Sequence, residues 1–129
     1  ASTRFRALPQ LNGNFSNNGN EVCFVTIGDA STSEGAFWET INAAGVVQAP
    51  IAVSVWDDGY GISVPKAYQT TKENISEILS GFQAGKDDRT GIDIYKGKAW
   101  DYAGLVDLYT KGIGNMRKTH RPALFHIEE

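Results

Sequence analysis

The sequence predicts a three-layer α/β/α fold with a mainly parallel β-sheet. Four short runs rich in apolar, β-branched or aromatic residues have the length of strands, and three longer stretches with helical spacing separate them. This alternation favours a parallel sheet with helices on both faces. The first run is apolar on both faces, as buried parallel strands are. The expected strands are 22–27, 51–56, 92–96 and 123–127.

A helix is expected directly after the first strand, over 34–48. The hydroxyls of residues 31–33 can cap its N-terminus, and Glu34 favours the positive end of its dipole. Pro50 ends it. Apolar residues recur at helical spacing and predict a buried stripe, namely Phe37, Ile41 and Ala44.

Two further helices are expected. Thr70 or Thr71 can cap a helix over 73–83, and Asp101 can cap a helix that runs to about residue 118. Glycines at 104, 112 and 114 weaken the last helix, because each costs roughly 1 kcal/mol relative to alanine. The inward-facing residues are expected to be Ile75, Ile78, Leu79 and Phe82 in the first of these helices and Leu105, Leu108 and Tyr109 in the second.

The composition is that of an ordinary globular protein of about one domain, 1–129, with 41% hydrophobic and 21% charged residues. A net charge of −3 without a basic block argues against a nucleic-acid partner. No apolar run reaches the roughly 18 residues of a membrane helix. Residues 1–10 lack the apolar core of a secretory signal. The single cysteine, Cys23, lies in an apolar run and is expected to be buried and inert, which fits a reducing compartment and a cytoplasmic location.

Two sequence features concern the ends of the chain. The chain does not begin with methionine and stops just after an apolar run, so we expect a piece of a longer protein. Segment 11–20 is rich in asparagine and glycine, which predicts a loop.

Acidic residues follow two of the predicted strands, at Asp29 and at Asp57-Asp58. Because parallel strands end at the same edge of a sheet, these carboxylates are expected beside the helix N-terminus that follows Asp29. Free N–H groups at such a terminus attract phosphate, and a hard cation such as Mg²⁺ can bridge carboxylates to phosphate. The residues thus indicate a magnesium-diphosphate site, although aspartate is also common as a plain turn or cap residue.

An ordered set of residues resembles the thiamine diphosphate motif of 2-oxoacid dehydrogenase E1 components of the α-subunit type. In that family GDG is followed by a helix with glutamate and asparagine, a strand, and then NN-x-Y-G. The pattern runs through 22–65 without a gap, and the resemblance extends over about 20–129. The residues that carry it are Gly28-Asp29-Ala30, Gly35, Glu39, Asn42, Pro50 and Asp57-Asp58-Gly59-Tyr60-Gly61.

The resemblance implies part of a thiamine diphosphate-binding fold and a role for each of five residues. Asp29, Asp58 and the backbone carbonyl of Tyr60 would bind Mg²⁺. Ala30 and Ser31 would present N–H groups to the diphosphate of thiamine diphosphate. Glycines 59 and 61 would allow the tight turn between them.

Two positions depart from the family pattern. Ala30 replaces a glycine, so its methyl group limits close approach of the backbone. Asp57 and Asp58 replace two asparagines. The added negative charge is expected to tighten metal binding, and to weaken diphosphate binding when the metal is absent.

The resemblance further implies oxidative decarboxylation of a 2-oxoacid, with acyl transfer to the lipoyl domain of an E2 component. Branched-chain acids and pyruvate are both open, with a preference for branched-chain acids. A β-type E1 subunit or fused β domain would complete the site, in a homo- or hetero-oligomer, so the isolated chain is expected to be inactive and to contain no catalytic residue of its own.

Two other functions fit part of the pattern. One is a Mg²⁺-dependent phosphoester hydrolase that uses Asp29 and Asp58, which leaves Tyr60 and the helix residues unexplained. The other is a non-catalytic pairing module that has lost the cofactor. Glu39 and Asn42 are interpreted as structural, and Trp38, Trp56 and Trp100 as core or interface residues. His126 is interpreted as a satisfied core or edge histidine, and Lys66 and Lys72 as solvated charges.

Overall fold

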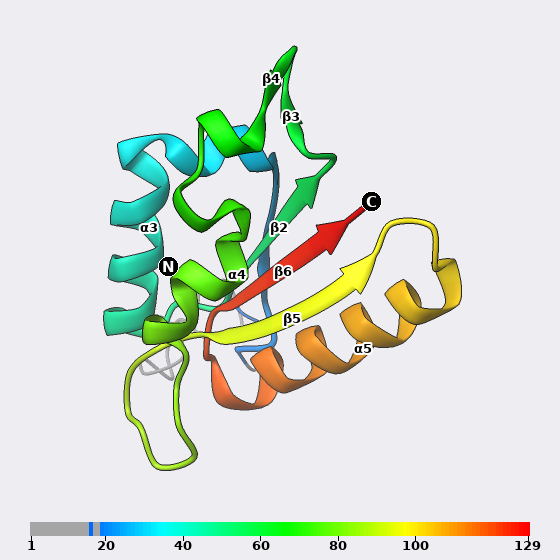
Figure 1. Ribbon diagram of the computed structural model, residues 1–129. Coiled ribbons are helices and arrows are strands. Elements are labelled where there is room, and N and C mark those ends of the chain that lie inside the picture. Colours follow the sequence, from blue (N-terminus) through cyan, green and yellow to red (C-terminus); the bar gives the residue numbers. More distant parts are fainter. Residues whose placement is uncertain (1–15, 17–18) are drawn as a thin grey trace.

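A computed structural model describes Ser16 and residues 19–129. Its centre is a four-stranded sheet with all neighbours parallel, in the order β1-β2-β6-β5 (Figure 1). This confirms the expected α/β class and parallel sheet. The strands are β1 (Cys23–Gly28), β2 (Ile51–Asp57), β5 (Asp93–Lys98) and β6 (Ala123–Glu128).

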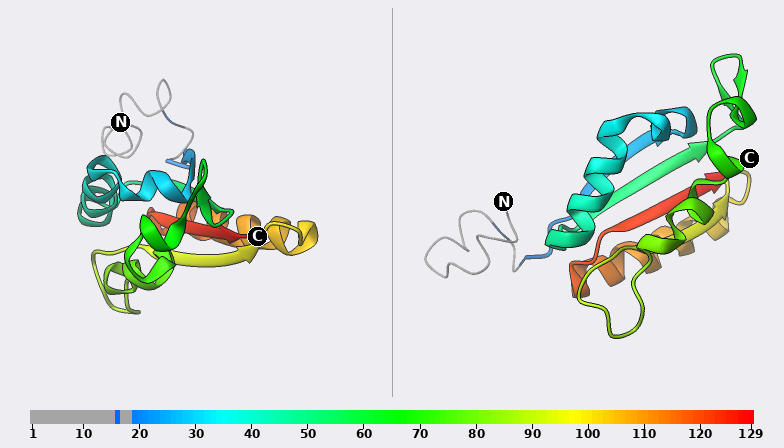
Figure 2. Two further views of the ribbon diagram at one scale, coloured as in Figure 1. Left: turned by 45° about the horizontal axis from the view of Figure 1, so that its top comes forward. Right: turned by 60° about the vertical axis from the view of Figure 1, so that its left-hand side comes forward.

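Helices cover both faces of the sheet, as expected for three layers (Figure 2). One face is covered by α3 (Gly35–Val47) and by the short α4 (Ile75–Ile78). The other face carries α5 (Tyr102–Thr119), which packs on β5 and β6. No helix among the described residues is long and apolar enough to cross a membrane.

Alternate residues of the central strands supply two separate apolar cores. On the α3 face, Val53 and Leu124 pack with buried residues of the helices, including Ile41 and Leu79. On the α5 face, Phe125 packs with Met116. Because successive side chains of a strand point to opposite faces, this division follows from the strand geometry. The apolar stripe predicted for α3 is buried as expected, at Phe37, Ile41 and Ala44.

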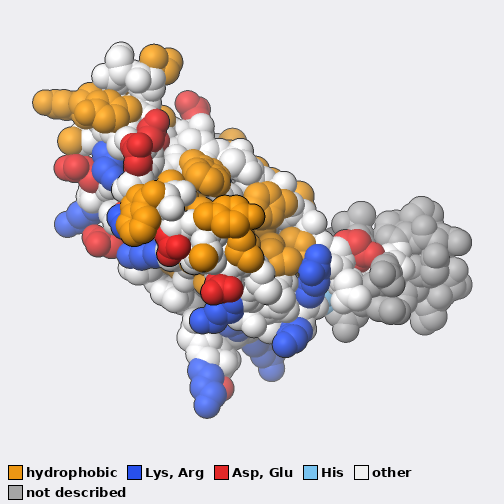
Figure 3. All heavy atoms as spheres, turned by 90° about the vertical axis from the view of Figure 1, so that its right-hand side faces the viewer, with side chains coloured by type: hydrophobic (Ala, Val, Ile, Leu, Met, Phe, Trp, Pro, Cys, Tyr) orange, Lys and Arg blue, Asp and Glu red, His pale blue; other side chains and the backbone are white. Residues whose placement is uncertain are grey.

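Strand β1 is less buried than its apolar sequence predicts. It forms one edge of the sheet, whereas α5 packs on β5 and β6 at the opposite edge. Phe24 in β1 is therefore 51% exposed, and Trp56 in the neighbouring β2 is 42% exposed. Cys23 is also exposed, so the expectation of a buried cysteine is wrong. Trp100 is 76% exposed and therefore lies outside the core. Hydrophobic side chains gather on the side of the molecule that carries α5 (Figure 3).

The helix expected over 73–83 is wrong as a continuous element. The segment forms 3-10 turns at Thr71–Glu73 and Leu79–Phe82 on either side of the single-turn α4. Its cap is Asn74, whose side chain accepts a hydrogen bond from the N–H of Glu77 at 3.1 Å, and not Thr70 or Thr71. Lys72 has a left-handed backbone (φ 68°), which interrupts any helix there.

The long helix α5 forms despite its glycines. Asp101 caps it as predicted, because its Oδ1 accepts a hydrogen bond from the N–H of Gly104 at 3.0 Å. At α3 the N-cap is Glu34, which provides no side-chain cap, so the hydroxyls of 31–33 do not serve as predicted. The predicted loop at 11–20 lies outside the described residues, apart from Ser16, Gly19 and Asn20.

A small antiparallel hairpin extends beyond the carboxyl edge of the sheet. It pairs β3 (Tyr60–Gly61) with β4 (Val64–Pro65) directly after β2 (Figure 1). The backbone N–H of Lys66 closes its base by donating to the carbonyl of Gly59 at 2.9 Å. The hairpin therefore stands next to the ends of β1 and β2.

Candidate functional site

The carboxyl ends of the parallel strands bring most of the predicted site residues together. Asp29 follows β1, and Asp57 and Asp58 stand at the end of β2. An open pocket of about 610 Å³ is lined by Asp29, Ala30, Asp58 and Tyr60, among others. Four of the five predicted residues thus share one pocket wall. The fifth, Ser31, is exposed and does not line it.

Asp29 is a buried carboxylate with one unpaired oxygen, whereas backbone N–H groups of Ala30 and of Asp29 itself bond to the group and partly offset the rise of its pKa. Only 6% of the residue is exposed, and its Oδ2 has no hydrogen-bond partner among the described residues. Burial raises the pKa of Asp29, and the negative charges of Asp57 and Asp58 raise it further. A buried carboxylate beside two others is costly unless positive charge neutralises it, and here Lys66 interacts electrostatically with Asp29 but does not bond to its Oδ2. The site therefore has the charge and the unpaired oxygen that a hard cation such as Mg²⁺ needs.

Asp58 and Tyr60 sit in a tight turn at the pocket. Oδ1 of Asp58 accepts a hydrogen bond from the N–H of Tyr60 at 3.0 Å, and Oδ1 of Asp57 accepts one from the N–H of Gly59 at 2.9 Å. Gly59 has a φ of 81°, a conformation that glycine adopts without strain, as predicted for this turn. The side chain of Asp58 is exposed, so it is accessible to a ligand from solvent.

The other predicted glycine of the turn, Gly61, serves a different purpose. A Cβ placed on it would collide with the side-chain amide of Gln69 and would lie 2.7 Å from the Cβ of Ala30. The missing side chain at position 61 therefore leaves room both for Gln69 and for the methyl group that replaces the motif glycine at position 30.

Ala30 and Ser31 lie in a 3-10 turn, Asp29–Ser33, which precedes α3. Helix α3 itself begins at Gly35, one residue after the predicted start at 34, so Ala30 and Ser31 lie in a separate turn before it. The hydroxyl of Thr32 donates to the carbonyl of Asp29 at 2.6 Å and steadies this turn.

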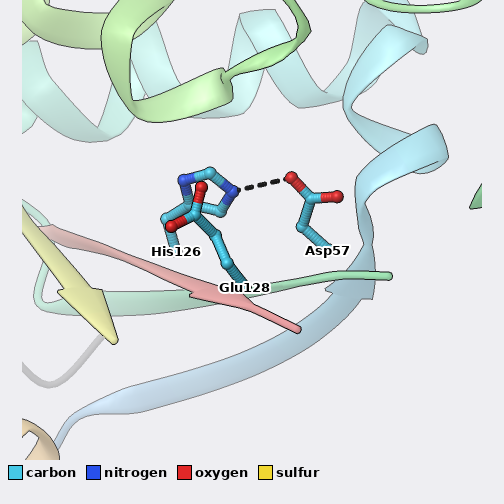
Figure 4. A group of neighbouring side chains, drawn as sticks. All are labelled: Asp57, His126 and Glu128. Carbon is cyan, nitrogen blue, oxygen red and sulfur yellow. Dashed lines mark hydrogen bonds and ion pairs between the residues drawn. The ribbon is translucent and has the colours of Figure 1, made fainter. Parts of the chain in front are cut away.

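The site also contains a network that the sequence did not reveal. Asp57 is buried, and its Oδ2 lies 3.0 Å from Nζ of Lys66. The same oxygen lies 3.0 Å from Nε2 of His126 (Figure 4). Burial alone would raise the pKa of Asp57, but the hydrogen bonds from His126 and Lys66 outweigh it and lower this pKa. Burial alone would lower the pKa of Lys66, but the hydrogen bond and charge of Asp57 raise it.

These contacts correct one prediction and confirm another. Lys66 is not a solvated charge, because it forms an ion pair with Asp57. His126 is a satisfied core histidine, fully buried, with Nδ1 bonded to the hydroxyl of Ser76 at 3.0 Å. An aspartate as the last residue of a buried strand was the available signal for the network. The pairing of β2 with β6, which brings His126 there, is not visible in the sequence.

A second group of potential metal ligands overlaps this network. Ligand atoms of Asp57, His126 and Glu128 lie within 4.8 Å of one another (Figure 4). Each residue already has partners, since Glu128 contacts Lys98 at 3.4 Å and Asn74 at 3.5 Å. The unpaired oxygen of Asp29 makes the neighbouring pocket the better cation site.

Comparison with known proteins identifies the family of the chain. The family model described as "Dehydrogenase E1 component" matches residues 10–85, which is more than half of the chain and includes all five predicted site residues. The chain belongs to the dehydrogenase E1 component family. Membership of this family implies the use of thiamine diphosphate.

The curated proteins similar to this chain are named as α-subunits. The chain is similar to "Pyruvate dehydrogenase E1 component subunit alpha" of Staphylococcus aureus and of Staphylococcus epidermidis, with 34% identity over 58 residues in each case. The matched segment covers 45% of this chain and 16% of each of those relatives. The chain therefore corresponds to only a small part of the relatives that it matches.

Proposed function

We propose that this chain forms the metal- and diphosphate-binding part of a thiamine diphosphate-dependent 2-oxoacid dehydrogenase E1 component. The observation that carries the proposal is the buried, unpaired Oδ2 of Asp29, in a carboxylate-rich pocket at the sheet edge. Family membership supports this function over that of a metal-dependent phosphoester hydrolase.

In this proposal Asp29 and Asp58 supply two carboxylate ligands to Mg²⁺, and Tyr60 supplies a backbone carbonyl. Ala30 and Ser31 donate backbone N–H groups to the diphosphate. The cation would neutralise the charge that raises the pKa of Asp29, and would bridge the carboxylates to the phosphate oxygens.

The bound cofactor supplies carbanion stabilisation, and the part of this chain is to anchor and orient it. The reaction we propose for the whole protein is oxidative decarboxylation of a 2-oxoacid, with transfer of the acyl group to the lipoyl domain of E2. A β-type subunit or fused β domain would be the partner, and the location cytoplasmic. Branched-chain acids are our preferred substrates, although the matched relatives are named pyruvate dehydrogenases.

Calorimetry of the intact protein with thiamine diphosphate, in the presence and absence of Mg²⁺, tests the proposal. We expect binding that requires Mg²⁺ and that Asp29→Asn weakens strongly. Absence of Mg²⁺-dependent binding in the intact wild-type protein would refute the proposal and favour a pairing module that has lost the cofactor. The isolated 129-residue chain is expected to show no decarboxylase activity.

A further inference from the structure

The two aspartates at the end of β2 have different surroundings. Asp58 is exposed and faces the open pocket, and the described part of the chain offers it no ion-pair partner. Asp57 is buried and points to the α3 side of the sheet, where it contacts His126 (Figure 4). Lys66 forms an ion pair with it there. A shared role as metal ligands therefore does not suit both residues.

The carboxylate of Asp57 accepts hydrogen bonds from three donors. Oδ1 takes the N–H of Gly59 at 2.9 Å, and Oδ2 takes Nζ of Lys66 at 3.0 Å. Because an ionised carboxylate only accepts, Nε2 of His126 is the third donor, at 3.0 Å from Oδ2. An asparagine has a single acceptor oxygen in its side chain and would present an N–H group to at least one of these donors. The bonding explains why aspartate stands where the family resemblance expects asparagine.

Two of these donors, Lys66 and His126, tie the turn to two separate parts of the fold. Lys66 directly follows the β3-β4 hairpin, so its ion pair with Asp57 joins the end of β2 to the end of the hairpin. His126 lies on β6, and its other ring nitrogen bonds to Ser76 of α4 at 3.0 Å. The hydroxyl of Ser76 in turn donates to Oδ1 of Asn74 at 2.8 Å.

We propose that Asp57 is a positioning residue for the metal site, fixed by Lys66 and His126, and that it holds the turn that carries Asp58 and the Tyr60 carbonyl. This inference rests on the proposed function, because it requires that these two groups bind the cation. Of the two negative charges that replace the asparagines of the family pattern, that of Asp57 is neutralised by Lys66 within the protein. Only the charge of Asp58 then acts on the metal.

Replacement of Lys66 separates positioning from simple electrostatics. Removal of a positive charge near a cation site should strengthen cation binding if charge alone matters. If Lys66 acts by holding Asp57, its removal loosens the turn and weakens binding. Loss of a residue that orients a metal ligand typically costs about 10- to 100-fold in metal affinity. The two accounts therefore predict opposite signs for the same substitution.

The experiment is a Mn²⁺ titration of the intact protein at saturating thiamine diphosphate, with free Mn²⁺ measured by electron paramagnetic resonance. We expect Lys66→Met to weaken Mn²⁺ binding by about 10-fold or more, and Lys66→Arg to restore most of the affinity because it keeps the ion pair. Lys72→Met is the matched control, since it removes the same charge from an exposed lysine in the 3-10 turn Thr71–Glu73. It should leave the affinity unchanged.

A second variant and a stability measurement guard against misfolding. Asp57→Asn should also weaken Mn²⁺ binding by about 10-fold or more, measured well below the unfolding temperature of each variant. Unchanged or tighter binding in folded Lys66→Met or Asp57→Asn, while Asp58→Ala binds weakly, would overturn the positioning role and leave the proposed function intact. Failure of the wild-type protein to bind Mn²⁺ would overturn both.

Discussion

The substitution Asp29→Asn should stabilise the metal-free protein. Asp29 is 6% exposed, its Oδ2 lacks a partner among the described residues, and Asp57 and Asp58 place further negative charge beside it. Desolvation of an unsatisfied buried polar group costs about 1–3 kcal/mol, and more when the group is charged. An amide retains part of that cost, and the carboxylate gains a few tenths of a kcal/mol at the start of the 3-10 turn. We therefore expect a net gain of about 1 kcal/mol at pH 7.

The pH dependence of this gain has a definite sign. The pKa of Asp29 is raised in the folded protein above its ordinary value of 3.8, so the native state binds its proton more tightly than the unfolded state. The destabilising effect of the charge is therefore complete above the folded pKa and disappears as the pH falls below 3.8. Urea unfolding in the presence of EDTA should show a gap between the variant and the wild-type protein that closes towards about pH 4.

Magnesium should reverse the order of stability. A ligand that binds only the native state adds about 2.7 kcal/mol of stability at 100 times its dissociation constant. With Mg²⁺ and thiamine diphosphate at such concentrations, the wild-type protein should become more stable than Asp29→Asn. A variant that is less stable than the wild type without metal at every pH would show that the carboxylate has an internal partner, and would remove the reason for placing a cation there.

Two further predictions concern the ion pair and helix α5. The pKa of Asp57 is lowered and that of Lys66 is raised, so their pair stabilises the fold fully between the ordinary pKa values of 3.8 and 10.5. The stability lost in Asp57→Asn should therefore be constant from about pH 5 to pH 9 and shrink outside that range. A loss that varies across about pH 5 to 9 would contradict the pairing. Gly112→Ala should destabilise the protein by about 1–3 kcal/mol in urea unfolding, because its Cβ would lie 2.5 Å from the ring of Phe125, whereas Gly114→Ala, with no neighbour within 4 Å, should stabilise it by up to about 1 kcal/mol. Equal effects of the two alanines would show that helix propensity alone governs both positions.

The sequence predicted those parts of the fold that local patterns determine. The strands, α3, α5 and the cap at Asp101 follow from apolar spacing and cap residues, and all are present. The prediction of one helix over 73–83 was wrong because the apolar spacing there resembles that of a helix. In the structure the backbone of Lys72 and the cap at Asn74 divide the segment. Local spacing does not report such tertiary constraints.

The sequence likewise predicted one part of the candidate site and missed another. The meeting of Asp29 and Asp58 followed from parallel strands that end at one edge. The role of Asp57 did not follow, because it depends on the order β2-β6 and on the return of the chain after the hairpin to bring Lys66 back. Exposure of Cys23 was missed for a related reason, since a run of apolar residues does not reveal which strand forms the sheet edge.

The close approach of positions 30 and 61 constrains the order in which this motif can change during evolution. A side chain on Gly61 would collide with the methyl group of Ala30, at a Cβ–Cβ distance of 2.7 Å. It would also collide with the side-chain amide of Gln69, so Ala30→Gly removes only one of two obstacles to a later Gly61→Ala, and the Gln69 side chain must move as well. Position 61 is thus coupled to both positions 30 and 69, and lineages that carry alanine at 30 and glutamine at 69 should retain glycine at 61.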